Sequence, residues 1–337
     1  MVPGAPPEAR WIRPEPRRAF AASLLQRMVN RALPRARVVE AQFLADGLRN
    51  ANFRLLLDSP AAPLVLRIYE HDASLCRKEV DVMRLVAGSV PVPEILHSQD
   101  CGEDDVPAFL LMRFVEGISF LALKRAGDRE AIAQAAAAVG ETLAFISRFT
   151  FATPGWLGPG PTVGAPLLSG PDPMPRFVDA CLESANLQLR MPAVLRHQVH
   201  QLIWRHAPEL AGLSGETRLV HGDFSRRNVL LRPTAGQWRV SAVLDWEFAV
   251  SGSPLADAGN FLRYERASRP LAEPHFSEGY RRAGGVLPPD WRRLARLVGL
   301  TATCESLTHD GLPAGIAAEL VELAQATVEN RDQRAVG

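Results

Sequence analysis

The segment Leu219–Leu231 constrains the fold most, because two short apolar strands in it flank a polar loop. The loop carries His221, Asp223 and Asn228. A further apolar strand follows after a turn of Pro, Thr and Gly, so the segment 219–247 predicts a β-hairpin. We therefore expect the polar residues of this loop to gather at one end of a small sheet.

The pairing of the two hairpin strands decides which polar side chains lie opposite each other. Pairing of the strands around the turn sets Asn228 opposite Asp245, within a residue or two, with Asp223 close by. An amide oxygen and carboxylates form an all-oxygen set that suits Mg²⁺. Asp223 is not assigned to a positively charged partner, so its carboxylate is free to orient or deprotonate a hydroxyl. Each residue is also a common turn former, but turn chemistry does not explain the ordered set.

The chain divides into two parts. Residues 17–115 are rich in strands with one main helix, and residues 116–337 are mostly helical and contain the hairpin. Residues 1–16 hold five prolines and are expected to form a flexible leader. The pattern predicts an α+β protein with a small β-rich lobe and a larger helical lobe. The expected elements are a helix over 19–32, strands over 38–44, 52–57 and 64–69, a helix over 72–87, strands over 94–98 and 108–115, a helix over 129–149, a loop over 151–175, two or three helices up to 210, the hairpin 219–247 and mostly helix from 255 to 330.

Composition excludes several classes of protein. The 38 basic and 37 acidic residues give a net charge of +1, which argues against a nucleic-acid or anionic-membrane binder. No apolar run reaches the ~20 residues that a membrane span needs, and residues 1–20 lack the pattern of a signal peptide. The four cysteines have no paired spacing for zinc or disulfides. We expect a soluble, cytoplasmic protein with reduced thiols.

The hairpin motif resembles the aminoglycoside phosphotransferase family, which has a protein-kinase-like fold and includes choline, homoserine and methylthioribose kinases among its relatives. The resemblance rests on the His-Gly-Asp of 221–223, on Asn228 and on the Asp-Trp-Glu that begins at Asp245. It implies that Asp223 is the catalytic aspartate and that Asn228 and Asp245 bind the metal.

Two further residues match positions that support the catalytic loop in this family. His221 matches the histidine that braces the loop. Asp257 stands in a segment that resembles the family's Gly-Asp-Pro-x-x-Asp, with Ser253 in place of the usual first aspartate. Asp257 would tie the start of its helix to the loop; alternatively, it only caps that helix.

The first part of the chain supplies an independent pair of charges. Glu79 falls on the apolar stripe of the helix 72–87, and a buried carboxylate needs a partner. Arg67 lies on a strand at the position where kinases place the phosphate-binding lysine. Arginine stays charged and can hold phosphate oxygens in a fork, although it is bulkier than lysine. The alternative is a surface arginine beside a half-exposed glutamate.

The resemblance also places the nucleotide. Gly47 and Asn50 lie in a turn that resembles the family's loop over the phosphates, although alone it is only a hairpin turn. Met112 and Phe114 lie in the connection between the lobes, where backbone groups would meet the adenine. In the catalytic loop, Ser225 and Arg226 lie where a side chain could approach the transferred phosphate, or they are solvated.

These features imply a kinase that uses ATP and Mg²⁺ to phosphorylate a hydroxyl of a small molecule, with GTP not excluded. The alternatives are a catalytically silent nucleotide-binding regulator of the same fold and a metal-dependent hydrolase. Residues 251–337 contain eleven acids and ten arginines without an acidic run, so a polycationic aminoglycoside is not the favoured acceptor. A macrolide, an amino alcohol, a sugar or another metabolite stays open, as does the oligomeric state.

Overall fold

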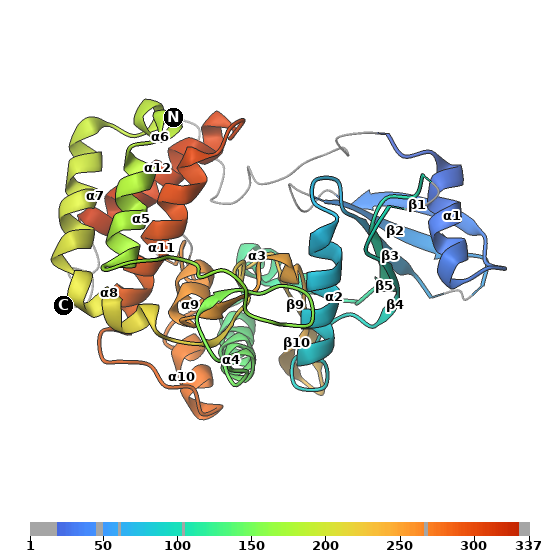
Figure 1. Ribbon diagram of the computed structural model, residues 1–337. Coiled ribbons are helices and arrows are strands. Elements are labelled where there is room, and N and C mark those ends of the chain that lie inside the picture. Colours follow the sequence, from blue (N-terminus) through green and yellow to red (C-terminus); the bar gives the residue numbers. More distant parts are fainter. Residues whose placement is uncertain (1–18, 45–49, 60–61, 103–104, 266–268, 330–337) are drawn as a thin grey trace, which may run out of the picture.

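The computed structural model describes residues 19–44, 50–59, 62–102, 105–265 and 269–329. Within these ranges, a small lobe built on a β-sheet lies beside a larger lobe of helices (Figure 1). The expected α+β architecture with two lobes is confirmed. The leader 1–16 and Gly47 lie outside the described residues.

The sheet of the small lobe has five strands in the order β1-β2-β3-β5-β4, and all neighbours are antiparallel. β2 (Ala51–Leu57) alternates buried and half-buried residues, as a strand with two different faces does. β3 (Leu64–Ile68) and β5 (Phe109–Arg113) lie inside the sheet and are mostly apolar along their length. β1 (Val38–Leu44) and β4 (Ile95–Gln99) form its edges.

One helix covers each face of this sheet (Figure 1). α1 (Ala22–Ala32) packs Leu25 and Met28 into a separate core on the outer face. α2 (Ser74–Val86) packs on the other face, and its buried apolar residues belong to the same core as those of the helical lobe. α2 therefore lies between the sheet and the second lobe, where it can transmit contacts from one to the other.

The helical lobe is built around α4 (Arg129–Ile146), whose apolar stripe predicts it from the sequence. Asp128 caps this helix by accepting the N–H groups of Glu130 (3.0 Å) and Ala131 (3.1 Å). α4 packs closely on α10, because a Cβ at Gly140 would lie only 2.0 Å from the carbonyl oxygen of Phe276. The elements of this lobe are β6 (Ile118–Ser119), α3 (Phe120–Ala126), α4 (Arg129–Ile146), β7 (Gly155–Trp156), α5 (Pro173–Leu182), α6 (Ala185–Arg190), α7 (Ala193–Arg205), α8 (Ala207–Ser214), β8 (Arg218–Val220), β9 (Val229–Thr234), β10 (Gln237–Val243), the 3-10 turn η1 (Trp246–Phe248), β11 (Val250–Gly252), α9 (Leu255–Phe261), α10 (His275–Arg282), α11 (Trp291–Thr308) and α12 (Ala314–Val328).

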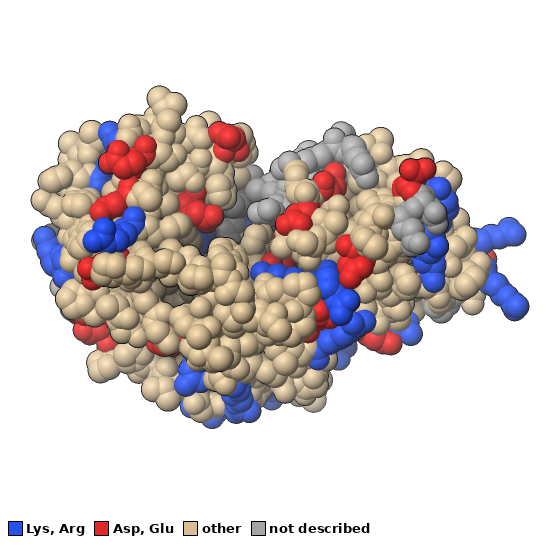
Figure 2. Space-filling model, viewed as in Figure 1, with Lys and Arg blue, Asp and Glu red and all other residues tan. Residues whose placement is uncertain are grey.

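The surface carries no single dominant charge on the face in Figure 2, where acidic and basic side chains are mixed over both lobes. All four cysteines are free thiols. Among the helices that the structure describes, none is long and apolar enough to span a lipid bilayer.

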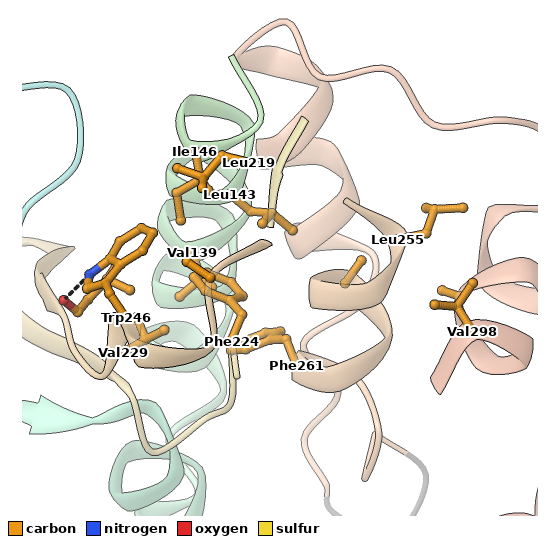
Figure 3. Packing of buried hydrophobic residues seen from close by; sticks show 14 of the residues in the cluster. Val139, Leu143, Ile146, Leu219, Phe224, Val229, Trp246, Leu255, Phe261 and Val298 are labelled. Atoms are coloured by element: carbon orange, nitrogen blue, oxygen red, sulfur yellow. Dashed lines mark hydrogen bonds between the residues drawn. The ribbon is translucent and has the colours of Figure 1, made fainter. Parts of the chain in front are cut away.

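A continuous hydrophobic core supports the loop 221–228 (Figure 3). Trp246 is fully buried in it, and its indole Nε1 donates to the carbonyl oxygen of Val243 (3.1 Å), so the one polar atom of the ring is satisfied. The core joins α4, the hairpin region and α9 through Val139, Leu143, Ile146, Leu219, Phe224, Val229, Trp246 and Phe261. The polar loop is therefore attached to a rigid base.

Some expectations about the elements were wrong. Four helices, rather than two or three, lie between residues 173 and 214. Pro192 precedes α7 and Pro208 is the second residue of α8, so prolines mark two of the three breaks in this segment. The expected loop 151–175 contains β7, which at two residues is too short to leave a sequence pattern. By contrast, the expected helix start near Asp72 is confirmed: α2 begins at Ser74, and Oδ1 of Asp72 accepts the N–H of Ser74 (3.0 Å).

Candidate active site

The polar loop begins with a turn that only glycine permits. Gly222 has a φ of +84°, and a Cβ at this position would lie 2.3 Å from the carbonyl oxygen of Phe248. The turn follows β8 directly and leaves Asp223, which is half-buried, at the start of the loop. The glycine of the motif thus has a backbone role, and the residues on either side carry the chemistry.

Asp257 fixes this turn from the first turn of α9. Its two oxygens accept the backbone N–H groups of His221 (2.7 Å) and Gly222 (3.0 Å), whereas the N–H of Leu255, the first residue of α9, donates to Oγ of Ser253 (3.4 Å). Burial raises the pKa of Asp257 to about 7, although the hydrogen bonds from these N–H groups favour the carboxylate. The carboxylate of Asp257 thus binds the loop, as one of the two predictions has it, and does not cap its own helix.

His221 links the loop to the hairpin. Its Nε2 lies 2.8 Å from the carbonyl oxygen of Leu244, and its Nδ1 accepts the backbone N–H of Asp223 (3.2 Å). Since a carbonyl only accepts, Nε2 carries the proton and the ring is neutral. Burial lowers the pKa of His221 to about 4, which agrees with a neutral, structural imidazole.

Asp223 is held by amides from two elements. The Nδ2 of Asn228 donates to its Oδ2 (2.9 Å), and the Nδ2 of Asn260 donates to its Oδ1 (3.2 Å). Burial and the charge of Asp245 raise its pKa to about 6, against the opposing effects of Asn260 and Arg263. The carboxylate is therefore oriented on both sides and close to other charges.

The hairpin brings the second carboxylate to this point. Val229 pairs with Val243, and the N–H of Leu244 donates to the carbonyl oxygen of Asn228 (2.8 Å). Asn228 thus faces Leu244, one residue before Asp245, within the expected uncertainty of the register. Asp245 then turns away from the strand in a left-handed conformation (φ 65°), which Asp tolerates better than most residues.

Arg67 crosses from the small lobe into a cluster of three carboxylates. Its Nε lies 3.1 Å from Oε2 of Glu79, its Nη1 contacts Oδ1 of Asp245, and its Nη2 lies 3.5 Å from Oε2 of Glu247. Tyr69 donates its hydroxyl to Glu79 (2.5 Å). Burial lowers the pKa of Arg67, but the three carboxylates outweigh it, so its pKa lies well above the usual value. The expected Arg67–Glu79 pair is present and buried, and the alternative of a surface arginine beside a half-exposed glutamate was wrong.

We expect Arg67→Ala to lose nucleotide affinity and stability together. The substitution leaves Glu79 and Glu247 buried without their cation, and breaking a buried pair in this way costs about 3–5 kcal/mol of unfolding free energy. Arg67→Lys keeps the charge and should retain part of both. Thermal denaturation and ATP titration of the two variants check this. Parental stability and affinity in Arg67→Ala would show that the cluster has neither role.

The small lobe adds one further contact to this cluster. Asn50, which is buried, donates its Nδ2 to Oε2 of Glu247 (2.8 Å). Asn50 therefore reaches the site, while Gly47 of the same turn lies outside the described residues. Glu247 and Asn260 are not among the residues expected at the site from the sequence. For Glu247 a signal was available, since it ends the Asp-Trp-Glu motif; Asn260 lies in α9 without a recognisable pattern.

Two backbone N–H groups at the end of β5 and in the connection after it already have hydrogen-bond acceptors in the small lobe. The backbone N–H of Phe114 donates to the carbonyl oxygen of Pro63 (3.1 Å), and the N–H of Arg113 donates to the carbonyl oxygen of Glu94 (2.9 Å). Neither N–H is therefore available to the adenine of a nucleotide. The side chain of Met112 is buried in the core, and Phe114 stacks against the guanidinium of Arg54 (5.1 Å). That backbone groups near Met112 and Phe114 meet the adenine stays a prediction, and it falls on groups other than the N–H of Arg113 and Phe114.

Arg226 does not reach the site, contrary to one expectation. Its guanidinium is buried in the helical lobe, where Nε donates to the carbonyl oxygen of Phe261 (3.1 Å) and Nη2 to Glu265 (2.9 Å). Its backbone carbonyl accepts the N–H of Leu121 (2.9 Å). Arg226 therefore anchors the loop rather than contacting a phosphate.

The donor set suits a hard cation that is shared with phosphates. Among the described residues, no group of three or more His, Cys, Asp or Glu side chains is placed to hold a metal ion. Asn228 uses its amide nitrogen on Asp223, which leaves its Oδ1 as an acceptor, and Asp245 is 28% exposed. Two oxygen donors plus substrate oxygens are typical of Mg²⁺ sites, so the residues fit this ion.

A comparison of the sequence with known protein families decides the family. The sequence profile of the phosphotransferase enzyme family matches residues 40–297. The chain belongs to the phosphotransferase enzyme family. Solved structures similar to this family member include the aminoglycoside phosphotransferase APH(4)-Ia, which is 20% identical with a TM-score of 0.67 over 92% of this chain and 99% of that one. The wild-type aminoglycoside 2′-phosphotransferase-IIIa in its GDP complex is 18% identical, with a TM-score of 0.67 over 92% and 99%. The expected protein-kinase-like fold is confirmed.

Similar curated proteins carry a different name. Acyl-CoA dehydrogenase family member 11 of Gallus gallus is 29% identical over 257 residues, which is 71% of this chain and 30% of that protein. The protein of the same name from Pongo abelii is 27% identical over 278 residues, or 77% and 33%. This phosphotransferase-family chain thus spans about a third of the length of these relatives.

Proposed function

We propose that this chain transfers the γ-phosphoryl group of ATP to a hydroxyl of a small molecule. The observation that carries the proposal is the convergence of both lobes on one point: Asp223 from the helical lobe, and Arg67 from the sheet through its contact with Asp245. Membership of the phosphotransferase family supports the same reaction.

The proposed roles follow from the geometry. Asp223 orients the acceptor hydroxyl and takes its proton as the new O–P bond forms and the bond to ADP breaks. Arg67 neutralises phosphate charge, with Glu79 and Tyr69 holding the guanidinium in place. Asn228 and Asp245 would hold Mg²⁺, which when bound neutralises charge on the phosphates. Because the transition state is loose, positioning and electrostatics account for most of the catalysis.

The identity of the nucleotide is a further part of the proposal. Complexes of APH(4)-Ia contain AMP-PNP or ADP with hygromycin B, which supports ATP here. GDP complexes of the aminoglycoside 2′-phosphotransferase-IIIa keep GTP open. A thermal-shift comparison of ATP and GTP, each with and without Mg²⁺, tests this choice, and it also separates the kinase from a hydrolase that needs no nucleotide.

For the acceptor, we expect a neutral or singly charged hydroxyl compound to be phosphorylated better than a polycationic aminoglycoside. Arg263 lies in the turn that follows α9, where its N–H donates to the carbonyl oxygen of Asn260 (3.3 Å), and its charge acts on Asp223. A positive charge there repels a polycationic acceptor. Acidic and basic residues are also balanced in residues 251–337.

A panel of acceptors read out by ADP release checks this expectation. The panel contains kanamycin, a macrolide, an amino alcohol, a sugar and, because of the name of the curated relatives, a hydroxylated acyl-CoA. Arg263→Ala should improve the relative use of kanamycin. Efficient, saturable phosphorylation of kanamycin by the parental protein would contradict the charge argument and leave the kinase proposal intact.

A silent regulator of the same fold is the main competing reading. It would bind nucleotide and release no ADP with any acceptor. We favour the enzyme, because Asp223, Asn228 and Asp245 are all present and Asp223 is held on both oxygens.

We further propose that the protein is located in the cytoplasm. Its free cysteines support this proposal, because thiols stay reduced in that compartment.

A further inference from the structure

We propose that a hairpin of the helical lobe, residues 155–165, is a latch that positions α2 and thereby holds Glu79 against Arg67. Lys78 and Asp81 are its partners on α2. This inference rests on the proposed function, since it assigns the latch to the nucleotide-binding pair.

The latch is rigidly built. The N–H of Trp156 donates to the carbonyl oxygen of Ala165 (2.9 Å), and that of Gly164 donates back to the carbonyl oxygen of Trp156 (2.9 Å). At its base, β7 pairs with β11, where Trp156 faces Val250. β11 follows η1, which carries Glu247, so the latch and the carboxylate cluster share one foundation.

Two contacts join the latch to α2. The backbone N–H of Gly160 donates to Oδ2 of Asp81 (2.8 Å), and Nζ of Lys78 lies 5.7 Å from the centroid of the Trp156 ring. Lys78 and Asp81 are only 6% and 8% exposed. Charged side chains are almost never buried to this degree unless they have partners. Asp81 also pairs with Arg77 (2.7 Å) and Arg84 (3.7 Å) of α2, so the Gly160 N–H adds the contact across the interface to a carboxylate that its own helix already neutralises.

The spacing on the helix connects these contacts to the site. Lys78 and Asp81 are three residues apart and share one side of α2, which faces the latch. Glu79 lies between them in sequence and points to Arg67, where it also accepts the N–H of Trp246 (3.3 Å). A shift of α2 would move the Glu79 carboxylate and loosen the Arg67 guanidinium. Lys78, Asp81 and Trp156 thus act through Glu79 and are positioning residues in this proposal.

The test compares nucleotide affinity with acceptor affinity. Trp156 is 49% exposed, so Trp156→Ala should fold. We expect this variant to bind Mg·ATP roughly 3- to 10-fold more weakly by calorimetry, with the KM for the acceptor unchanged. Trp156→Phe keeps an aromatic face and should restore affinity. Asp81→Ala probes the second contact, and Leu189→Ala, at an 87% exposed site on α6, is the matched control with parental affinity.

A double-variant cycle separates positioning from general stability. If the latch acts through Glu79, Trp156→Ala should add no further loss of affinity to Glu79→Gln. Parental Mg·ATP affinity in both Trp156→Ala and Asp81→Ala, or full additivity with Glu79→Gln, would overturn the latch. A parental protein that binds neither Mg·ATP nor Mg·GTP would contradict the proposed function itself, which is a different result.

Discussion

Asp223→Asn is expected to lose turnover by about 10²–10⁴ while binding Mg·ATP nearly as the parent does. The amide has the shape of the carboxylate and still accepts a hydrogen bond through its one oxygen, but it cannot take the proton of the acceptor hydroxyl. Asn228 and Asn260 each donate to one oxygen of Asp223, so the substituted side chain keeps at least one of these contacts. Steady-state turnover and calorimetric titration of the same preparation measure both quantities.

Asn260→Ala is a useful companion to this variant. It removes the donor on Oδ1 and leaves the carboxylate in place, so we expect a smaller loss of turnover than for Asp223→Asn. Parental turnover in Asp223→Asn would show that this loop is not the active site. Loss of Mg·ATP binding in Asp223→Asn would instead indicate that Asp223 acts through the metal.

Asp245→Ala is expected to fail in a different way. It removes a hard oxygen donor, so Mg²⁺-dependent ATP binding should weaken on the order of 10- to 100-fold and turnover should fall with it. It also removes one of three carboxylates around Arg67, but Glu79 and Glu247 stay to balance the guanidinium. ATP titration with and without Mg²⁺ checks this: binding without the metal should change much less.

Asp245→Asn is the control for size, because it keeps one oxygen and removes the charge. An intermediate affinity for Mg·ATP is the expected result. If Asp245→Ala binds Mg·ATP as the parent does and Asp223→Asn does not, the two roles are exchanged.

Much of the fold was predictable because its local patterns are strong. The strand over 38–44 has the expected bounds, and α4 begins at the expected residue, Arg129, because an apolar stripe and a capping Asp128 both indicate it. Elements that depend on tertiary context left no pattern. β7 has two residues and exists through its pairing with β11, and α3 is a single short helix after the connection.

The site was predictable where sequence neighbours share a task. The spacing of Asp223, Asn228 and Asp245 is fixed by one hairpin, and the structure brings these residues together. Contacts between distant segments were harder to foresee. Asn260 reaches Asp223 from α9, and the latch reaches α2 across about eighty positions; burial and backbone geometry, which a single sequence does not display, create both.

Transfer of labelled phosphate from γ-labelled ATP to the acceptor panel tests the central claim most directly. The account predicts that the parental protein, with Mg²⁺, forms a labelled product with at least one hydroxyl compound, and that Asp223→Asn, folded and binding Mg·ATP, forms it at least about a hundred times more slowly. A label that appears only as inorganic phosphate, or product formation at the parental rate by Asp223→Asn, would contradict it.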